Sequence, residues 1–212
     1  MSRDELDGQS IGDFLGQLAA RISAPGAGAT AAVEAALSAS LVAMVGRFTR
    51  DEEHAEVVGE IVATADGLRD VCLRSAADDE AAFAAVAEAM KLPRGTDDEK
   101  AARSRRLSEV QLAATRPPLA VLEAAAELMS LAARVLPVAN PNLVSDVAAA
   151  TAAARAAATT ARLAVEANLP GIRDEEARAR LVSAVAAVED LARRADDVEA
   201  GVRARMRSEA AP

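Results

Sequence analysis

A single carboxylate interrupts the apolar helical face formed by residues 72–90. At helical spacing Asp79 falls on this face, whereas its acidic neighbours Asp78 and Glu80 point away from it. The other members of the face are apolar: Cys72, Ala76, Phe83, Val86 and Met90. An ionised carboxylate in an apolar interior is costly, so Asp79 must be neutralised, paired or used. Burial would raise its pKa toward neutrality, which suits proton transfer; the alternative is a structural hydrogen bond to a neighbouring helix.

A glycine turn precedes the most apolar segment of the chain. It contains Gly26 and Gly28, and Thr30 follows in the first turn of the predicted helix. Glycines allow the backbone to approach a ligand closely, and a helix N-terminus presents free N–H groups to an anion or a carbonyl. We therefore expect Gly26, Gly28 and Thr30 to contact a ligand; an ordinary turn between helices is the alternative.

A second polar turn contains Asn140, Asn142, Ser145 and Asp146. Ser145 or Asp146 as a helix N-cap explains part of this composition. It does not explain the two asparagines, whose side-chain amides are suited to fixing a heteroaromatic ring by hydrogen bonds.

A basic segment follows the helix that carries Asp79, in a chain whose net charge is −9. Lys91, Arg94 and Lys100 lie in it. Local positive charge attracts anions even when the whole protein is negative, so a site for an anionic small molecule is one interpretation. A solvated surface is the other.

The composition argues against several classes of function. His54 and Cys72 are the only histidine and cysteine, which excludes a His-rich or Cys-rich metal site and makes a Ser-His or Cys-His nucleophile pair improbable. The acidic charge and the absence of Trp and Tyr argue against nucleic acid as a partner. Glu34 interrupts the closest approach to a membrane-spanning run, at residues 29–46, so no membrane partner is expected. The polar N-terminus and the lone cysteine predict a cytoplasmic protein.

Alanine dominates the apolar residues, which make up 51% of the chain, while aromatic residues make up 1%. Alanine has the highest helix propensity and lets helix axes approach closely, and no segment shows the period-two alternation of a strand. We predict one all-α domain over residues 1–212, an up-and-down antiparallel bundle of six to seven helices. The predicted helices span about residues 10–22, 29–48, 51–90, 96–116, 117–135, 145–168 and 174–206.

Five short motifs follow one another along the chain. They are PGAGA at 25–29, D-x-x-x-F at 79–83, KLPRGTDDEKAAR at 91–103, NPNLVSD at 140–146 and ANLPGI at 167–172. In this order they resemble the cyclodeaminase domain of formiminotransferase-cyclodeaminase and its stand-alone bacterial relatives, the cyclodeaminase/cyclohydrolase family. The resemblance spans roughly residues 10–175.

The resemblance implies an all-helical homodimer with a folate site near the subunit interface. The family reaction closes 5-formiminotetrahydrofolate to 5,10-methenyltetrahydrofolate and releases ammonia. Formiminotetrahydrofolate cyclodeaminase is therefore our leading hypothesis for the function. Close relatives instead interconvert methenyl- and 10-formyltetrahydrofolate with water, so a methenyltetrahydrofolate cyclohydrolase is the nearest alternative, and the sequence does not separate the two reactions. The matched aspartate, Asp79, is the family's proposed proton-transfer residue. A tetrahydrofolate derivative is then the substrate, and no metal or permanently bound cofactor is required.

By the same resemblance, the polar segments surround the folate. Its glutamate tail would be bound by one or more of three cations, Lys91, Arg94 and Lys100. The loop at 140–146 and the turn at 26–28 would hold the pterin and the one-carbon unit. Asn168, which by itself is typical of a C-terminal helix cap, belongs to the ANLPGI motif.

Four alanines depart from the family pattern. Ala27 and Ala29 stand where the loop usually has Gly and Ser, Ala139 where a Gly usually precedes the first asparagine, and Ala164 where an Asn is common. Thr30 would restore a hydroxyl, but in another direction, since a helix turns by about 100° per residue. A non-catalytic helical homodimer of the same family is therefore the alternative to an enzyme.

Overall fold

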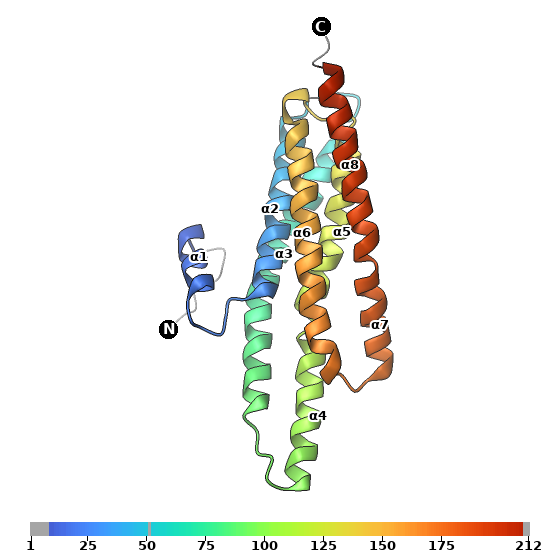
Figure 1. The fold of residues 1–212 in the computed structure, drawn as a ribbon. Helices are drawn as coiled ribbons and strands as arrows, with labels where there is room; N and C mark the ends of the chain where they lie inside the picture. Colours follow the sequence, from blue (N-terminus) through green and yellow to red (C-terminus); the bar gives the residue numbers. More distant parts are fainter. Residues whose placement is uncertain (1–8, 51, 210–212) are drawn as a thin grey trace.

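The computed structural model describes residues 9–50 and 52–209, and every regular element in these ranges is a helix (Figure 1). Eight are α-helices and two are short 3-10 helices: α1 (Ile11–Ala19), α2 (Ala27–Phe48), α3 (Ala55–Met90), α4 (Asp97–Ala113), α5 (Arg116–Val135), η2 (Pro141–Leu143), α6 (Val144–Asn168), η3 (Leu169–Gly171), α7 (Glu175–Ala186) and α8 (Val188–Glu209). The predicted all-α fold with antiparallel neighbours is confirmed.

The core lies between α2, α3, α5 and α6, with α8 packed against α6 and α5. α2 is the central helix, because α3, α5 and α6 all pack against it. Alanine fills most of its buried positions, and this allows the neighbouring helices to approach closely. By length and composition α2 alone among the described helices is apolar enough to cross a membrane, but 61% of its most apolar window is buried against the other helices, as in the core helix of a bundle.

The lengths of α2 and α3 determine where the site forms. α3 has 36 residues and α2 has 22, which correspond to about 54 Å and 33 Å. The part of α3 that follows Asp79 therefore continues past the start of α2 and pairs with α4, so that an α3–α4 hairpin extends beyond the four-helix core (Figure 1). The guanidinium of Arg103 on α4 donates to the Met90 carbonyl at the end of α3, at 3.1 Å.

Local sequence signals place most helix ends. Thr96 and Glu99 form the predicted capping box at the start of α4. α4 ends at Ala113 and α5 begins at Arg116, next to the two prolines that were expected to end or kink the helix. The charged C-terminal segment, expected as one helix, is two helices that meet at Ala187, which gives eight α-helices in the described ranges.

Candidate active site

The carboxylate of Asp79 lies against the N-terminus of α2. Gly26 is the N-cap of that helix and has no side chain to accept a hydrogen bond from the first turn. Asp79, reaching over from α3, accepts a hydrogen bond from the backbone N–H of Ala29 instead. It thus does for α2 what an N-cap side chain usually does. Because this hydrogen bond uses the backbone, the alanine at position 29 does not remove it.

Gly28 leaves the space that this carboxylate occupies. A Cβ at this position would lie 2.0 Å from Oδ1 and 2.4 Å from Oδ2 of Asp79. Its backbone has no positive φ, so conformational freedom is not the reason for glycine here. The close approach expected at the glycine turn is therefore made by Asp79, a side chain of the protein itself.

The surroundings of Asp79 change its acidity. Burial raises the pKa of this carboxyl above its usual value, the hydrogen bond from Ala29 lowers it, and the nearby charge of Glu80 raises it again. The net direction is upward. A carboxyl that is partly withdrawn from water, and whose pKa is raised, is suited to accept and return a proton.

Asp79 opens into a cleft of about 360 Å³, here called the Asp79 cleft, at the junction between the four-helix core and the α3–α4 hairpin. The glycine turn forms one wall and α3 another, while Gln111 and Ala114 line the cleft from the end of α4, and the end of α6 lines it too. Its polar side chains are few: Ser23, Asp79, Gln111 and Asn168. Its apolar lining includes Phe83, Val86, Met90, Ala114, Ala164 and Ala167.

The apolar face of α3 serves two purposes. Its first part, Cys72 and Ala76, is buried in the core. Beyond Asp79 the same face lines the cleft, where Phe83 is 47% exposed and Met90 is 55% exposed. Large apolar side chains left in water at one wall of a cleft are typical of a surface that a ligand covers.

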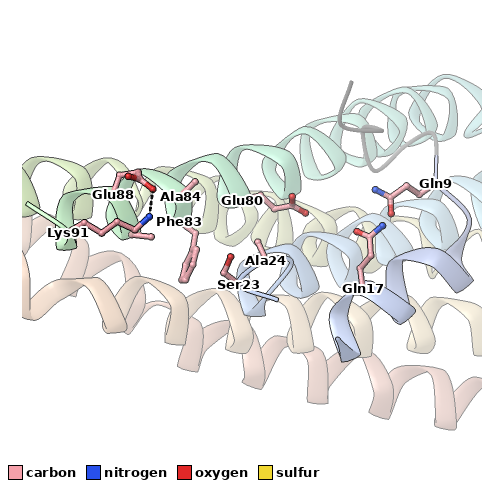
Figure 2. A pocket seen from close by; sticks show the side chains of 10 residues that line it. Gln9, Gln17, Ser23, Ala24, Glu80, Phe83, Ala84, Glu88 and Lys91 are labelled. Carbon is pink, nitrogen blue, oxygen red and sulfur yellow. Dashed lines mark hydrogen bonds and ion pairs between the residues drawn. The ribbon is translucent and has the colours of Figure 1, made fainter. Parts of the chain in front are cut away.

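A second cleft of about 420 Å³ adjoins the first and is called the α1 cleft (Figure 2). The two clefts share Ser23, Ala24 and Phe83. In Figure 2 the side chains of Gln9 and Gln17 lie across from Glu80, and Lys91 is joined to Glu88. An elongated ligand in the Asp79 cleft can therefore continue past Phe83 into the α1 cleft.

The three predicted cations lie in and after the turn that joins α3 to α4. Lys91 lines the α1 cleft, but its Nζ is 2.6 Å from Glu88. Lys100 is paired with Asp97 at 2.8 Å, on the exposed surface of α4. Arg94 is exposed and lines neither cleft. Of the three, the structure brings only Lys91 to a cleft next to Asp79.

The asparagine turn is not brought to the Asp79 cleft within one chain. It precedes α6, whose 25 residues span about 37 Å and whose far end carries Asn168. The amide nitrogen of Asn140 lies 3.4 Å from the Phe48 carbonyl at the other end of α2, and Asn140 also accepts a hydrogen bond from the Asn142 backbone. The expectation that this turn and the glycine turn hold one ligand is thus incorrect for a single chain, because the rigid helix between the motifs keeps them apart.

The remaining members of that turn follow the same geometry. Ser145 is exposed and Asp146 half-buried in the first turn of α6, and neither lines the Asp79 cleft. Ala139, one of the four departures, is buried, and its carbonyl accepts from Arg205 at 2.8 Å. Asn140 lines a separate cleft of about 590 Å³ with Phe48 and Arg205.

Other predicted residues do meet Asp79. Gly26, Gly28 and Asn168 all line its cleft. The side-chain nitrogen of Asn168 donates to the Ala164 carbonyl at 3.0 Å. Thr30 does not line the cleft, since its hydroxyl donates to the Gly26 carbonyl at 3.0 Å within its own helical turn.

Gln111 and Phe83 also line the cleft, and neither was predicted to be a site residue. Gln111 lies in the last turn of α4 between Val110 and Leu112, with no local signal of a role. The signal is remote: Gly171, in the ANLPGI motif, leaves the space that the Gln111 side chain fills. In the described part of the chain, no three His, Cys, Asp or Glu side chains gather in a way that could hold a metal ion.

Asp79, the glycine turn and the ANLPGI motif all lie in a part of the chain that matches a known family. The family model of formiminotransferase-cyclodeaminase matches residues 10–187. The chain belongs to the formiminotransferase-cyclodeaminase family. All the residues that line the Asp79 cleft lie within the matched range.

This chain matches its relatives over different shares of their own lengths. A methenyltetrahydrofolate cyclohydrolase of Methylorubrum extorquens is 36% identical over 170 residues, which are 78% of this chain and 82% of that protein. The formimidoyltransferase-cyclodeaminase of Mus musculus is 32% identical over 170 residues, but these cover only 31% of its length. This chain therefore corresponds to about a third of the mouse protein.

A crystal structure supports the fold. Formiminotetrahydrofolate cyclodeaminase from Thermotoga maritima matches with a TM-score of 0.80 over 96% of this chain and 98% of that one. At 24% sequence identity, this likeness shows that the two proteins share the family fold.

Proposed function

We propose that this chain is a folate one-carbon enzyme that acts on the carbon bridging N5 and N10 of tetrahydrofolate. The observation that carries the proposal is the placement of Asp79, a partly buried carboxyl with a raised pKa that caps α2 and faces a mainly apolar cleft. Among the family reactions we place methenyltetrahydrofolate cyclohydrolase first. The relative with that name, at 36% identity, aligns over 82% of its own length, so it is a protein of similar extent.

In this reaction the methenyl carbon of a cationic substrate is attacked by water. The Asp79 carboxylate accepts a proton from the water as the C–O bond forms, giving a neutral adduct and a carboxylic acid. The acid then donates its proton to N5 as the C–N5 bond breaks. The adduct hydroxyl loses its proton to solvent, which leaves a formyl group on N10 and returns Asp79 to the carboxylate. The net change is consumption of water and release of one proton, with a single group moving protons in both steps.

The electrostatics suit this sequence of steps. Burial disfavours the ionised form of Asp79, whereas a cationic substrate in the same cleft favours it. Substrate binding therefore shifts Asp79 toward the carboxylate, the form that can accept a proton from water. The apolar lining excludes bulk water and strengthens the interaction between the two charges. Phe83 and Met90 would be covered by the bound ring system.

The cyclodeaminase reaction is the second candidate, favoured by the 32% identity to formimidoyltransferase-cyclodeaminase. N10 attacks the carbon of the protonated formimino group to close the ring, and Asp79 accepts the N10 proton. The same proton then goes to the amino group of the adduct, which leaves as ammonia and yields the methenyl cation. The required proton movements are equivalent to those of the cyclohydrolase, so the site geometry suits either reaction.

We also propose that the chain works as a cytoplasmic homodimer without a permanently bound cofactor. The support for a dimer is that large apolar side chains remain exposed on the neighbouring helices α2 and α6, where Leu37 is 54% exposed and Leu163 is 55% exposed. Sedimentation of the protein tests this, and a monomer at micromolar concentration would contradict it. The buried, unpaired Cys72 supports a reducing compartment.

The test of function is turnover of the two substrates by the purified chain. We expect the chain to hydrolyse methenyltetrahydrofolate. Turnover of 5-formiminotetrahydrofolate would show that it also has the cyclodeaminase activity. Asp79→Asn should reduce kcat by about 100-fold or more, the usual contribution of a general acid–base, while the protein stays folded. Asp78→Asn is the matched control, since that neighbouring carboxylate is exposed and should be dispensable.

The possible failures have different meanings. No turnover of either substrate by the wild type would reject the enzyme and leave the non-catalytic homodimer. Turnover that survives Asp79→Asn would reject only the role given to this residue.

A further inference from the structure

Gln111 presents an unused carboxamide to the Asp79 cleft. It lies on α4, is half-buried, and lines the cleft together with Asp79. Within residues 9–50 and 52–209 its side chain has no hydrogen bond to another residue. A half-buried amide that forms no bond inside the protein keeps both its acceptor and its donors for another molecule.

Gly171 provides the space for this amide. A Cβ at position 171 would lie 1.6 Å from Oε1, 2.3 Å from Cδ and 2.6 Å from Nε2 of Gln111. Gly28 has the same relation to the Asp79 carboxylate, which lines the same cleft. Two glycines from distant segments thus each allow one polar group to lie close against the backbone at the edge of one cleft.

The neighbours of Gln111 make its amide distinctive. The other side-chain amide of the cleft, that of Asn168, already donates to the Ala164 carbonyl. Much of the remaining lining is apolar, and hydrogen bonds in such surroundings are stronger than in water. A planar carboxamide, with one acceptor and two donors, matches a ring that carries an N–H next to a carbonyl. The pyrimidinone part of a reduced pterin has this pattern.

We propose that Gln111 is a substrate-positioning residue, whose carboxamide hydrogen-bonds the bicyclic ring of the reduced folate, and that Gly171 determines where this amide lies. The inference rests on the proposed function. In this proposal the two residues have different roles: Asp79 transfers protons, and Gln111 binds the ring that carries the reacting carbon.

The test separates binding from chemistry. Gln111→Met keeps the length of the side chain and its helix propensity but removes both hydrogen-bonding atoms. We expect KM for methenyltetrahydrofolate to rise about 10- to 100-fold, the loss expected for one or two hydrogen bonds, with kcat changed less than about threefold. Competitive inhibition by tetrahydropterin should weaken by the same factor. An unchanged KM, a fall in kcat alone, or no inhibition of the wild type by tetrahydropterin would overturn the proposal.

Gly171→Ala is the second variant, since it displaces the amide without altering it. Because the atoms in its way are the end of a flexible side chain, the melting temperature should hardly change. We expect a similar rise in KM, and no further rise when Gly171→Ala is combined with Gln111→Met. Additive effects of the two changes would show that Gly171 acts in another way and would overturn its assigned role.

The controls keep the two proposals distinguishable. Gly59→Ala is the matched glycine control, because a Cβ there meets nothing within 4 Å, and it should leave KM unchanged. Wild-type protein that converts neither folate defeats the proposed function, and this inference with it. Normal wild-type turnover with an unaltered Gln111→Met variant defeats the inference alone.

Discussion

Replacing Gly28 by alanine would move the Asp79 carboxylate without removing any polar atom. The new Cβ would lie 2.0 Å from Oδ1, whereas ordinary contacts begin at 3.4 Å, so this oxygen must retreat by about 1.4 Å. Both carboxylate oxygens and Cγ lie within 2.4 Å of the new atom, so a small rotation does not relieve the clash. The group must swing away from the N-terminus of α2, and the hydrogen bond from Ala29 is lost.

The effects on rate and on stability should differ in size. A misplacement of about 1 Å at a reacting group can cost about 100-fold in rate, which equals about 2.7 kcal/mol of barrier. Stability should change little, because alanine in a helix is favoured over glycine by about 0.5–1 kcal/mol and the lost hydrogen bond costs about 0.5–1.5 kcal/mol. We therefore expect Gly28→Ala to lower kcat by about two orders of magnitude, with a melting temperature within a few degrees of the wild type.

The assay is steady-state hydrolysis of methenyltetrahydrofolate, followed by the loss of its absorbance, together with thermal unfolding of the same samples. Gly67→Ala on α3 is the control, since a Cβ there meets nothing within 4 Å. It should retain full activity and gain slightly in stability. A folded Gly28→Ala variant with the wild-type kcat would refute the link between this glycine, the position of Asp79 and catalysis.

Three further predictions concern stability and reactivity. Because the pKa of Asp79 is raised above 3.8, the folded state binds more protons than the unfolded chain above that pH; the contribution of Asp79 to stability is greatest in acid and is lost as the pH rises through its folded pKa. Asp79→Asn should remove this part of the pH dependence in denaturation curves, and an identical curve would contradict the reasoning. Gly46→Ala would place a Cβ 2.6 Å from Val62 and should lower the free energy of unfolding, measured by urea titration, by about 1–3 kcal/mol. An unchanged free energy of unfolding would mean that α2 and α3 can shift apart to accommodate the methyl group. Burial raises the pKa of the Cys72 thiol to about 11, so a thiol reagent should label it only after unfolding, and rapid labelling of the native protein would show that the core opens.

Much of the fold follows from local sequence. Alanine-rich composition predicts helices, and the capping box at Thr96 and the prolines at 117 and 118 place the ends of α4 and the start of α5. The break at Ala187 was missed because the sequence around it favours helix on both sides. No proline or glycine marks it, so no local signal separates the two helices.

Some residues of the site can be found from the sequence, whereas others are recognised only once the helices are packed together. Helical periodicity was enough to single out Asp79, because an acidic residue on an apolar face is unusual in any helix. Its partner could not be predicted in this way, since Gly28 and Asp79 are on different helices and only the packing of α3 on α2 brings the carboxylate to the backbone. Gln111 carried no signal at all, as its amide becomes notable only where η3 passes beside α4.

The sequence by itself therefore determined the helices, the family and the acid that can move a proton, because each depends on residues close together in the chain. Only the tertiary structure decided which polar segments meet. A stiff helix of 25 residues keeps the asparagine turn away from Asp79, and the same helix brings Asn168 and the ANLPGI motif to it. The physical reason is the rise of about 1.5 Å per residue of a helix, which converts separation along the chain into a distance that short motifs cannot reveal.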